Sequence, residues 1–187
     1  MKMLTGSFYK SFYHVYGQLL NMYKPRFLVN THINLRVLDI FEKDSMLARC
    51  CIHEAGHAII DTAFGGIVES VTVDPQGGGL TTSRFNCPLD SCDEDMVHMS
   101  GYFFEALICG RYKQPFPEYF PVYSPDIRNT ARGNADHVIE DLERLVILND
   151  ILVKAVEETA IELFTSGLSI DGNTVREIWN RSRTINE

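Results

Sequence analysis

Two histidines and a glutamate interrupt an otherwise apolar segment of the sequence, "CCIHEAGHAIIDTAF", residues 50–64. His53 and His57 are four residues apart, so on an α-helix their side chains lie on one face, one turn apart. Two imidazoles in this arrangement can bind one metal ion, and Glu54 is placed to deprotonate a metal-bound water. This HExxH pattern predicts a zinc-dependent hydrolase with His53 and His57 as metal ligands and Glu54 as the catalytic base.

The neighbours of Glu54 on the expected helix support a functional role for its carboxylate. The residues three and four positions away are Cys50, Cys51, His57 and Ala58, and none of them is Lys or Arg. Burying a carboxylate without a cationic partner is costly. A metal ion held by the adjacent histidines would relieve that cost.

A catalytic zinc site usually has three protein ligands and an open position for water, so a third ligand must come from elsewhere in the chain. Residue type alone leaves five candidates open: Glu105, Asp126, Asp136, His98 and His137. Each of them also has an ordinary structural interpretation, as a surface charge, a helix cap or a hydrogen-bonded core group.

A buried helix is expected to carry the HExxH motif. Asp44 or Ser45 can cap its start, and Gly65 with Gly66 can end it. The next segment, "IVESVTV", alternates apolar and polar residues and is rich in β-branched side chains, which predicts a strand. "DPQGGG" then predicts a turn and "LTTSRF" a returning strand, so a β-hairpin should follow the helix.

The rest of the chain is predicted to be mainly helical. Four prolines make residues 111–129 an irregular, ordered loop, and apolar residues at helical spacing predict a helix from about residue 129. Other helices are expected over 93–110, over "DILVKAVEETAIELFTSG", and over "GNTVREIWNRSR", which Asp171 can cap. The predicted fold class is mainly α with a small β-hairpin or sheet.

Size, charge and cysteine content restrict the class of protein. The 187 residues are 45% hydrophobic, enough for one well-packed domain, and the net charge of −8 disfavours a nucleic-acid partner. The odd number of cysteines, five, indicates a reducing compartment, and neither a signal peptide nor a run of about 20 apolar residues is present. We therefore expect a cytoplasmic protein without a membrane span.

Residues 1–43 differ from the rest of the chain in their aromatic content, and several of the aromatic side chains recur at helical spacing. Such a stripe usually packs on its own domain, and docking to a partner or a membrane surface is the alternative. We divide the chain into this N-terminal helical segment, packed on or extending the domain, and a domain over residues 44–187.

Four stretches, in this order, resemble the peptidase domain of the FtsH-type zinc metalloproteases: "HEAGHAII", "VESVTVDPQGGGLTTS", "MSGYFFEALICG" and "LSIDGNTVREIW". Together they span about residues 45–180. The resemblance implies a zincin-like fold with one zinc ion per chain. It also implies that the third ligand is Asp136, in "RGNADHVIEDL", with Asp126 in "SPDIRN" as the rival. Glu105 matches a glutamate that would orient a ligand or the zinc helix, and a purely structural hydrogen bond is its alternative role.

FtsH-type enzymes join this domain to an ATPase module and a membrane anchor, and this sequence contains neither a Walker A pattern nor a membrane span. The resemblance therefore implies an ATP-independent metallopeptidase that acts on flexible or unfolded proteins, unless a separate unfoldase or self-association assists it. A substrate could add as a strand along the edge of the hairpin. The alternative is a zinc-containing, non-proteolytic protein that binds a protein partner.

Overall fold

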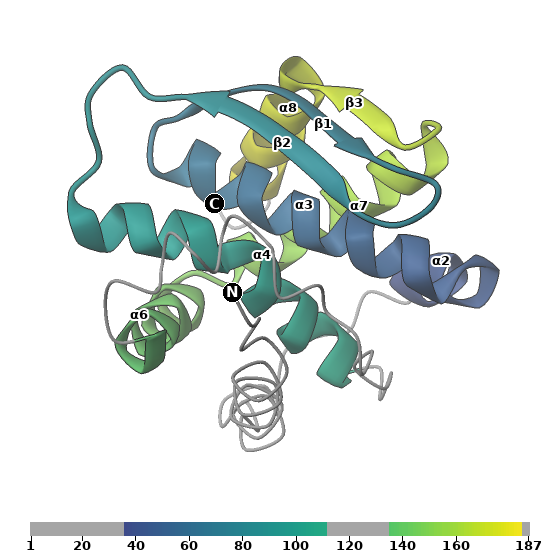
Figure 1. The fold of residues 1–187 in the computed structure, drawn as a ribbon, viewed down its shortest axis with the longest axis horizontal. Helices are drawn as coiled ribbons and strands as arrows, with labels where there is room; N and C mark the ends of the chain where they lie inside the picture. The colour runs from purple at the N-terminus through teal and green to yellow at the C-terminus, as the bar shows by residue number, and fades with distance from the viewer. Residues whose placement is uncertain (1–35, 112–134, 185–187) are drawn as a thin grey trace, which may run out of the picture.

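The structure is a computed structural model that describes residues 36–111 and 135–184. Helices dominate it, and a small three-stranded antiparallel sheet completes the fold, which confirms the predicted fold class at this level (Figure 1). The elements, in chain order, are α2 (Arg36–Lys43), α3 (Ser45–Ala63), β1 (Ile67–Val73), β2 (Gly79–Arg84), α4 (Ser91–Arg111), α6 (Ala135–Leu148), α7 (Ile151–Thr165), β3 (Ser169–Asp171) and α8 (Gly172–Thr184).

Helix α3 is the central element, and it begins where the sequence predicts. The Asp44 side chain accepts hydrogen bonds from the N–H groups of Met46 and Leu47, each at 3.0 Å, which satisfies two donors that the helix itself cannot. The helix packs against α4, α7 and the sheet, so apolar residues are buried on several of its faces, Ile52 and Ile59 among them. This explains why the segment lacks the one-sided apolar pattern of a surface helix.

The sheet has the strand order β2-β1-β3, with β1 antiparallel to both neighbours. The predicted hairpin of β1 and β2 is confirmed, and its turn includes Gly77 and Gly78 at φ values of 99° and 105°, which suit glycine. Strand β3 was not expected, because three residues are too few to show alternation. It leads directly into α8, where Asp171 accepts a hydrogen bond from the Thr174 N–H at 2.8 Å, as the predicted cap.

The elements form layers around α3 (Figure 1). The sheet lies along one side of α3, α4 lies along the other, and α6 packs against α4. Helix α2 adds Val37, Ile40 and Phe41 to the buried core, and it packs against α3 and α7. Of the N-terminal segment 1–43, only α2 lies within the described residues. The proline-rich loop lies outside them from residue 112 to its end.

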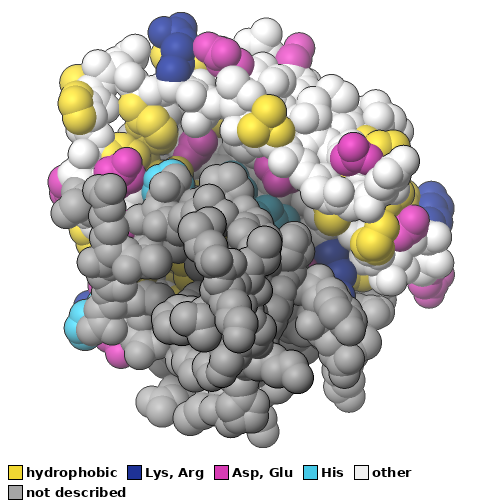
Figure 2. Space-filling model, viewed as in Figure 1, with side chains coloured by type: hydrophobic (Ala, Val, Ile, Leu, Met, Phe, Trp, Pro, Cys, Tyr) yellow, Lys and Arg dark blue, Asp and Glu magenta, His cyan; other side chains and the backbone are white. Residues whose placement is uncertain are grey.

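No helix in residues 36–111 and 135–184 is both long enough and apolar enough to cross a lipid bilayer. On the face shown in Figure 2, acidic and apolar side chains are scattered over the described surface and Lys or Arg side chains are few. The described part of this face thus agrees with the net charge of −8.

A buried carboxylate ties α3 to the edge strand. Asp61 is 3% exposed, its Oδ2 accepts a hydrogen bond from the Ser83 hydroxyl on β2, and its Oδ1 has no hydrogen-bond partner. Burial raises the pKa of Asp61 from 3.8 to about 6, although the Ser83 hydrogen bond and nearby His98 act in the opposite direction. The ionised form therefore weakens the fold at neutral pH.

The unfolding of the metal-free protein should report this cost. Well below its unfolded-state pKa of 3.8, Asp61 is protonated in both states, and as the pH rises from there through the folded-state pKa of about 6 the folded state loses stability. Relative to Asp61→Asn, the wild-type free energy of unfolding should fall by about 2 to 3 kcal/mol from pH 4 to pH 7. Urea titrations measure this free energy of unfolding. Asp39→Asn, at an exposed position of α2, is the control for the lost charge. A difference that does not change with pH would contradict this assignment.

Candidate metal centre

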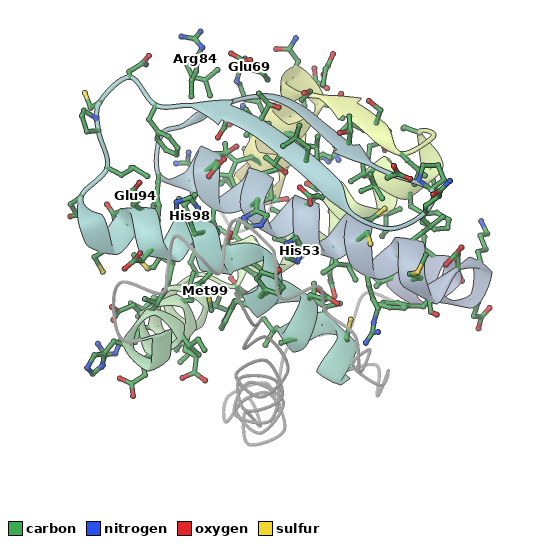
Figure 3. The ribbon with its side chains drawn as sticks, in the orientation of Figure 1. His53, Glu69, Arg84, Glu94, His98 and Met99 are labelled. Carbon is green, nitrogen blue, oxygen red and sulfur yellow. The ribbon has the colours of Figure 1, made fainter. Side chains whose placement is uncertain are left out.

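His53 and His57 bring their imidazoles together on α3. Their Nε2 atoms are 3.2 Å apart, and the rings meet edge to face with centroids 4.9 Å apart. Both side chains lie toward α4, and Figure 3 shows His53 between the two helices. The four-residue spacing thus produces the predicted pairing of these two nitrogen atoms.

The other ring nitrogens have partners that determine the tautomer. His57 Nδ1 lies 3.0 Å from the Val97 carbonyl oxygen, which can only accept, so Nδ1 carries the proton. His53 Nδ1 lies 3.4 Å from Oε2 of the buried Glu105, which favours the same tautomer. With the protons on Nδ1, the two Nε2 atoms, 3.2 Å apart, each carry a lone pair that could bind one cation.

Gly101 on α4 provides the space beside these two atoms. A Cβ at position 101 would lie 2.5 Å from His57 Nε2 and 2.7 Å from His53 Nε2. Gly56 allows the helices to approach this closely, because a Cβ there would lie 3.0 Å from the Ser100 carbonyl oxygen. The donor type, the tautomer and this cradle fit a zinc ion, which imidazole nitrogen ligands commonly hold.

Glu54 faces the hairpin. Its side chain is buried, with 7% exposure, and its Oε2 accepts a hydrogen bond from the Thr81 hydroxyl at 2.9 Å. A Cβ at Gly79 would lie 2.5 Å from Glu54 Cγ, so strand β2 packs directly on this side chain. The carboxylate therefore lies between α3 and the edge strand, on the residue that directly follows His53.

The structure brings Glu105, but not His137, to this centre. Glu105 contacts His53, as described, whereas His137 is exposed on α6 and lies 3.8 Å from Glu140. His98 lies near buried Asp61 and 4.0 Å from Glu94, its neighbour along α4 (Figure 3). Neither contact places a third histidine beside His53 and His57.

The two aspartates predicted as alternatives for the third ligand fall outside what the structure describes. Asp126 lies in the gap between the described ranges, and Asp136 is the second residue of α6 without a described side chain. Among the side chains that are described, no three from His, Cys, Asp or Glu come together to hold a metal ion. The described part of the centre thus consists of two imidazole donors, the carboxylate that orients one of them, and the adjacent Glu54.

The cysteines of α3 contribute to packing. Burial raises the pKa of Cys51 to about 12, and the same effect raises that of Cys109 on α4 to about 12. Both therefore remain protonated at neutral pH in the metal-free protein, as buried core thiols do. Cys50 is partly exposed, and its Sγ accepts a hydrogen bond from the Gly78 N–H at 3.5 Å, which links α3 to the hairpin turn.

Four residues of the centre were not identified from the sequence: Thr81, Ser100, Gly101 and Tyr102. Ser100 Oγ lies 3.2 Å from His57 Nδ1, and the Tyr102 ring packs edge to face on His53 at 4.5 Å between centroids. A signal for Gly101 was present, since it precedes Glu105 by four residues and so shares its helix face. No sequence signal indicated Thr81, because its contact with Glu54 depends on how β2 packs on α3.

The sequence matches no protein-family model and has no significant match among characterised proteins. A function must therefore be argued from the geometry of this centre, together with the motif resemblance described above.

Gly101→Ala should abolish or greatly weaken zinc binding, because its methyl group would occupy the space beside both Nε2 atoms. We expect at least about a tenfold loss of affinity, the scale on which changes around metal ligands act. Gly56→Ala crowds the same helix crossing at the Ser100 carbonyl without a methyl group beside the Nε2 atoms, so it shows how much of any loss comes from separating the helices rather than from filling this space. Competition with a chromogenic chelator measures affinity, and circular dichroism checks folding. A folded Gly101→Ala protein with wild-type zinc affinity would rule out this cradle.

Proposed function

We propose that this protein is a zinc-dependent metallopeptidase that hydrolyses peptide bonds in flexible or unfolded proteins without ATP. One observation supports this most: the paired Nε2 atoms of His53 and His57, each ring oriented through Nδ1 by an acceptor, with the buried carboxylate of Glu54 on the next residue. The motif resemblance to FtsH-type peptidase domains supports the same assignment and implies a zincin-like fold.

His53 and His57 would hold the zinc ion, with Asp136 as the third ligand and Asp126 as the alternative. Zinc, when bound, lowers the pKa of water and polarises a substrate carbonyl. Glu105 would keep His53 in the ligating tautomer through the contact with Nδ1.

Glu54 would act as the base. A carboxylate oxygen of Glu54 accepts the proton of the attacking water, and the same side chain then delivers a proton to the leaving amine. Its position on α3 next to His53, with the hairpin closing over it, suits a group that must be held in place and kept from bulk water. A structural zinc site has no need of such a group, which argues against a purely binding role.

The substrate would lie along β2. This strand pairs with β1 on one side only among the described strands, so its other edge can accept an extended peptide through main-chain hydrogen bonds. Recognition of this kind is independent of side-chain sequence and requires an unfolded segment. A folded protein would therefore have to be presented in unfolded form, either by a separate unfoldase or with the help of self-association of this protein.

Cleavage of a fluorescently labelled unfolded protein tests the reaction. The zinc-loaded wild type should cleave it without ATP, and Glu54→Gln at matched zinc content should be slower by at least about a hundredfold, as expected for loss of a general base. Loss of cleavage on adding a chelator, and recovery with zinc, would link activity to the metal. Absence of cleavage by the fully zinc-loaded wild type would overturn the proposal and favour the binding role.

The third ligand is tested by zinc content. Asp136→Ala should lose most of the bound zinc while Asp126→Ala keeps it, and the opposite result would transfer the role to Asp126. His53→Ala and His57→Ala should each empty the site, because a site with one protein ligand fewer binds zinc far more weakly. Atomic absorption on dialysed protein measures the metal, and His137→Ala is the control for removing an exposed histidine.

A further inference from the structure

Strand β2 presents every second residue to α3. Gly79 and Thr81 both contact Glu54, and Ser83 contacts Asp61, which lies about two helical turns further along α3. This is the alternation of a strand, in which residues two apart share a face. Thr82 therefore points to the opposite face of the sheet. The edge strand thus lies against α3 through three small, alternate residues, Gly79, Thr81 and Ser83.

Thr81 makes two contacts with the same glutamate. Its hydroxyl lies 2.9 Å from Glu54 Oε2 and 3.1 Å from the Glu54 main-chain oxygen. A hydroxyl has one proton, so it is shared between, or alternates between, these two acceptors. Both acceptors belong to Glu54. The Thr81 hydroxyl therefore bridges the carboxylate and the main chain of Glu54, and it fixes the direction in which the Glu54 side chain projects from the helix.

Gly79 restricts the same side chain from the other direction. A Cβ at position 79 would lie 2.5 Å from Glu54 Cγ, 2.8 Å from Cδ and 2.8 Å from Oε1. The strand backbone therefore packs against the stem and one oxygen of the carboxylate, while the Thr81 hydroxyl engages the other oxygen. Glutamate is otherwise a side chain with considerable rotamer freedom. Here the edge strand holds it in one position.

We propose that Thr81 is a positioning residue for Glu54 and that the edge strand, through Thr81 and Gly79, sets the orientation in which this carboxylate accepts a proton. The inference rests on the proposed peptidase function and deepens it. It assigns to β2 a second role besides pairing with substrate. The same strand that would receive the peptide also fixes the base that acts on it, so a shift of β2 along α3 would misplace both at once.

Kinetics of four variants test the positioning role. Thr81→Val removes the hydroxyl and keeps the shape, and it should lower kcat about 10- to 100-fold with little change in KM or in zinc content. Thr81→Ser restores the hydroxyl and should recover most of kcat. Thr165→Val makes the same change at the end of α7, where the hydroxyl donates to main-chain oxygens of its own helix, and should stay near wild type. Gly79→Ala should lower kcat because its methyl group displaces the carboxylate.

A double-mutant cycle on the metal-free protein tests the contact without using activity. Thr81→Val should destabilise the wild type more than it destabilises Glu54→Ala, because the carboxylate that the hydroxyl engages is missing in the second background. Urea unfolding of the four proteins of the cycle gives the coupling. Additive effects would show that Thr81 does not hold the Glu54 side chain, and would overturn the inference.

The two tests separate failure of this inference from failure of the proposed function. If the zinc-loaded wild type cleaves nothing, the peptidase proposal fails and the positioning role fails with it, while the cycle still decides whether the contact exists. If the wild type is active and Thr81→Val keeps the wild-type kcat, only the inference is overturned. The inference is also overturned if Thr81→Ser fails to recover kcat, or if the control Thr165→Val lowers kcat as much as Thr81→Val does.

Discussion

The close crossing of α3 and α4 is the constraint on which the candidate centre depends. Gly56 on one helix and Gly101 on the other remove the side chains that would separate the two backbones, since a Cβ at Gly56 would lie 3.1 Å from the Gly101 Cα. At this separation the α4 backbone comes beside the Nε2 atoms of both histidines, and the Val97 carbonyl reaches His57 Nδ1 at 3.0 Å. Larger residues at the crossing would move α4 away, and the imidazoles would lose both their orientation and the space between them.

The polar groups buried around α3 are held by different elements on its two sides. Toward α4, the histidine rings receive partners from the Glu105 carboxylate and the Val97 carbonyl. Toward the sheet, Thr81 and Ser83 donate to Glu54 and Asp61. Glu54 and Asp61 are buried and the two histidine side chains are half-buried. Because a buried polar group without a partner costs about 1 to 3 kcal/mol, α3 needs polar partners from both neighbouring layers. The contacts that orient the residues of the centre therefore also contribute to the stability of the fold.

The fold and the centre could be predicted to different extents. The HExxH helix, its Asp44 cap and the hairpin turn follow from local patterns, because each depends on residues within a few positions of one another. The helical character of residues 135–165 was also predictable from apolar spacing. Strand β3 was not predicted, because its three residues form a strand only by pairing with β1, whose residues precede them by roughly a hundred positions.

The sequence by itself determined that His53 and His57 share one face of a helix with Glu54 beside them, because a four-residue spacing on an α-helix leaves no other arrangement. Only the tertiary structure decided which atoms complete the surroundings of these residues. Thr81 is 27 residues from Glu54 in the sequence and Glu105 is 52 residues from His53. Neither contact follows from a local sequence pattern. These contacts arise because the sheet and α4 pack on opposite sides of α3, a consequence of burying its apolar residues on both sides.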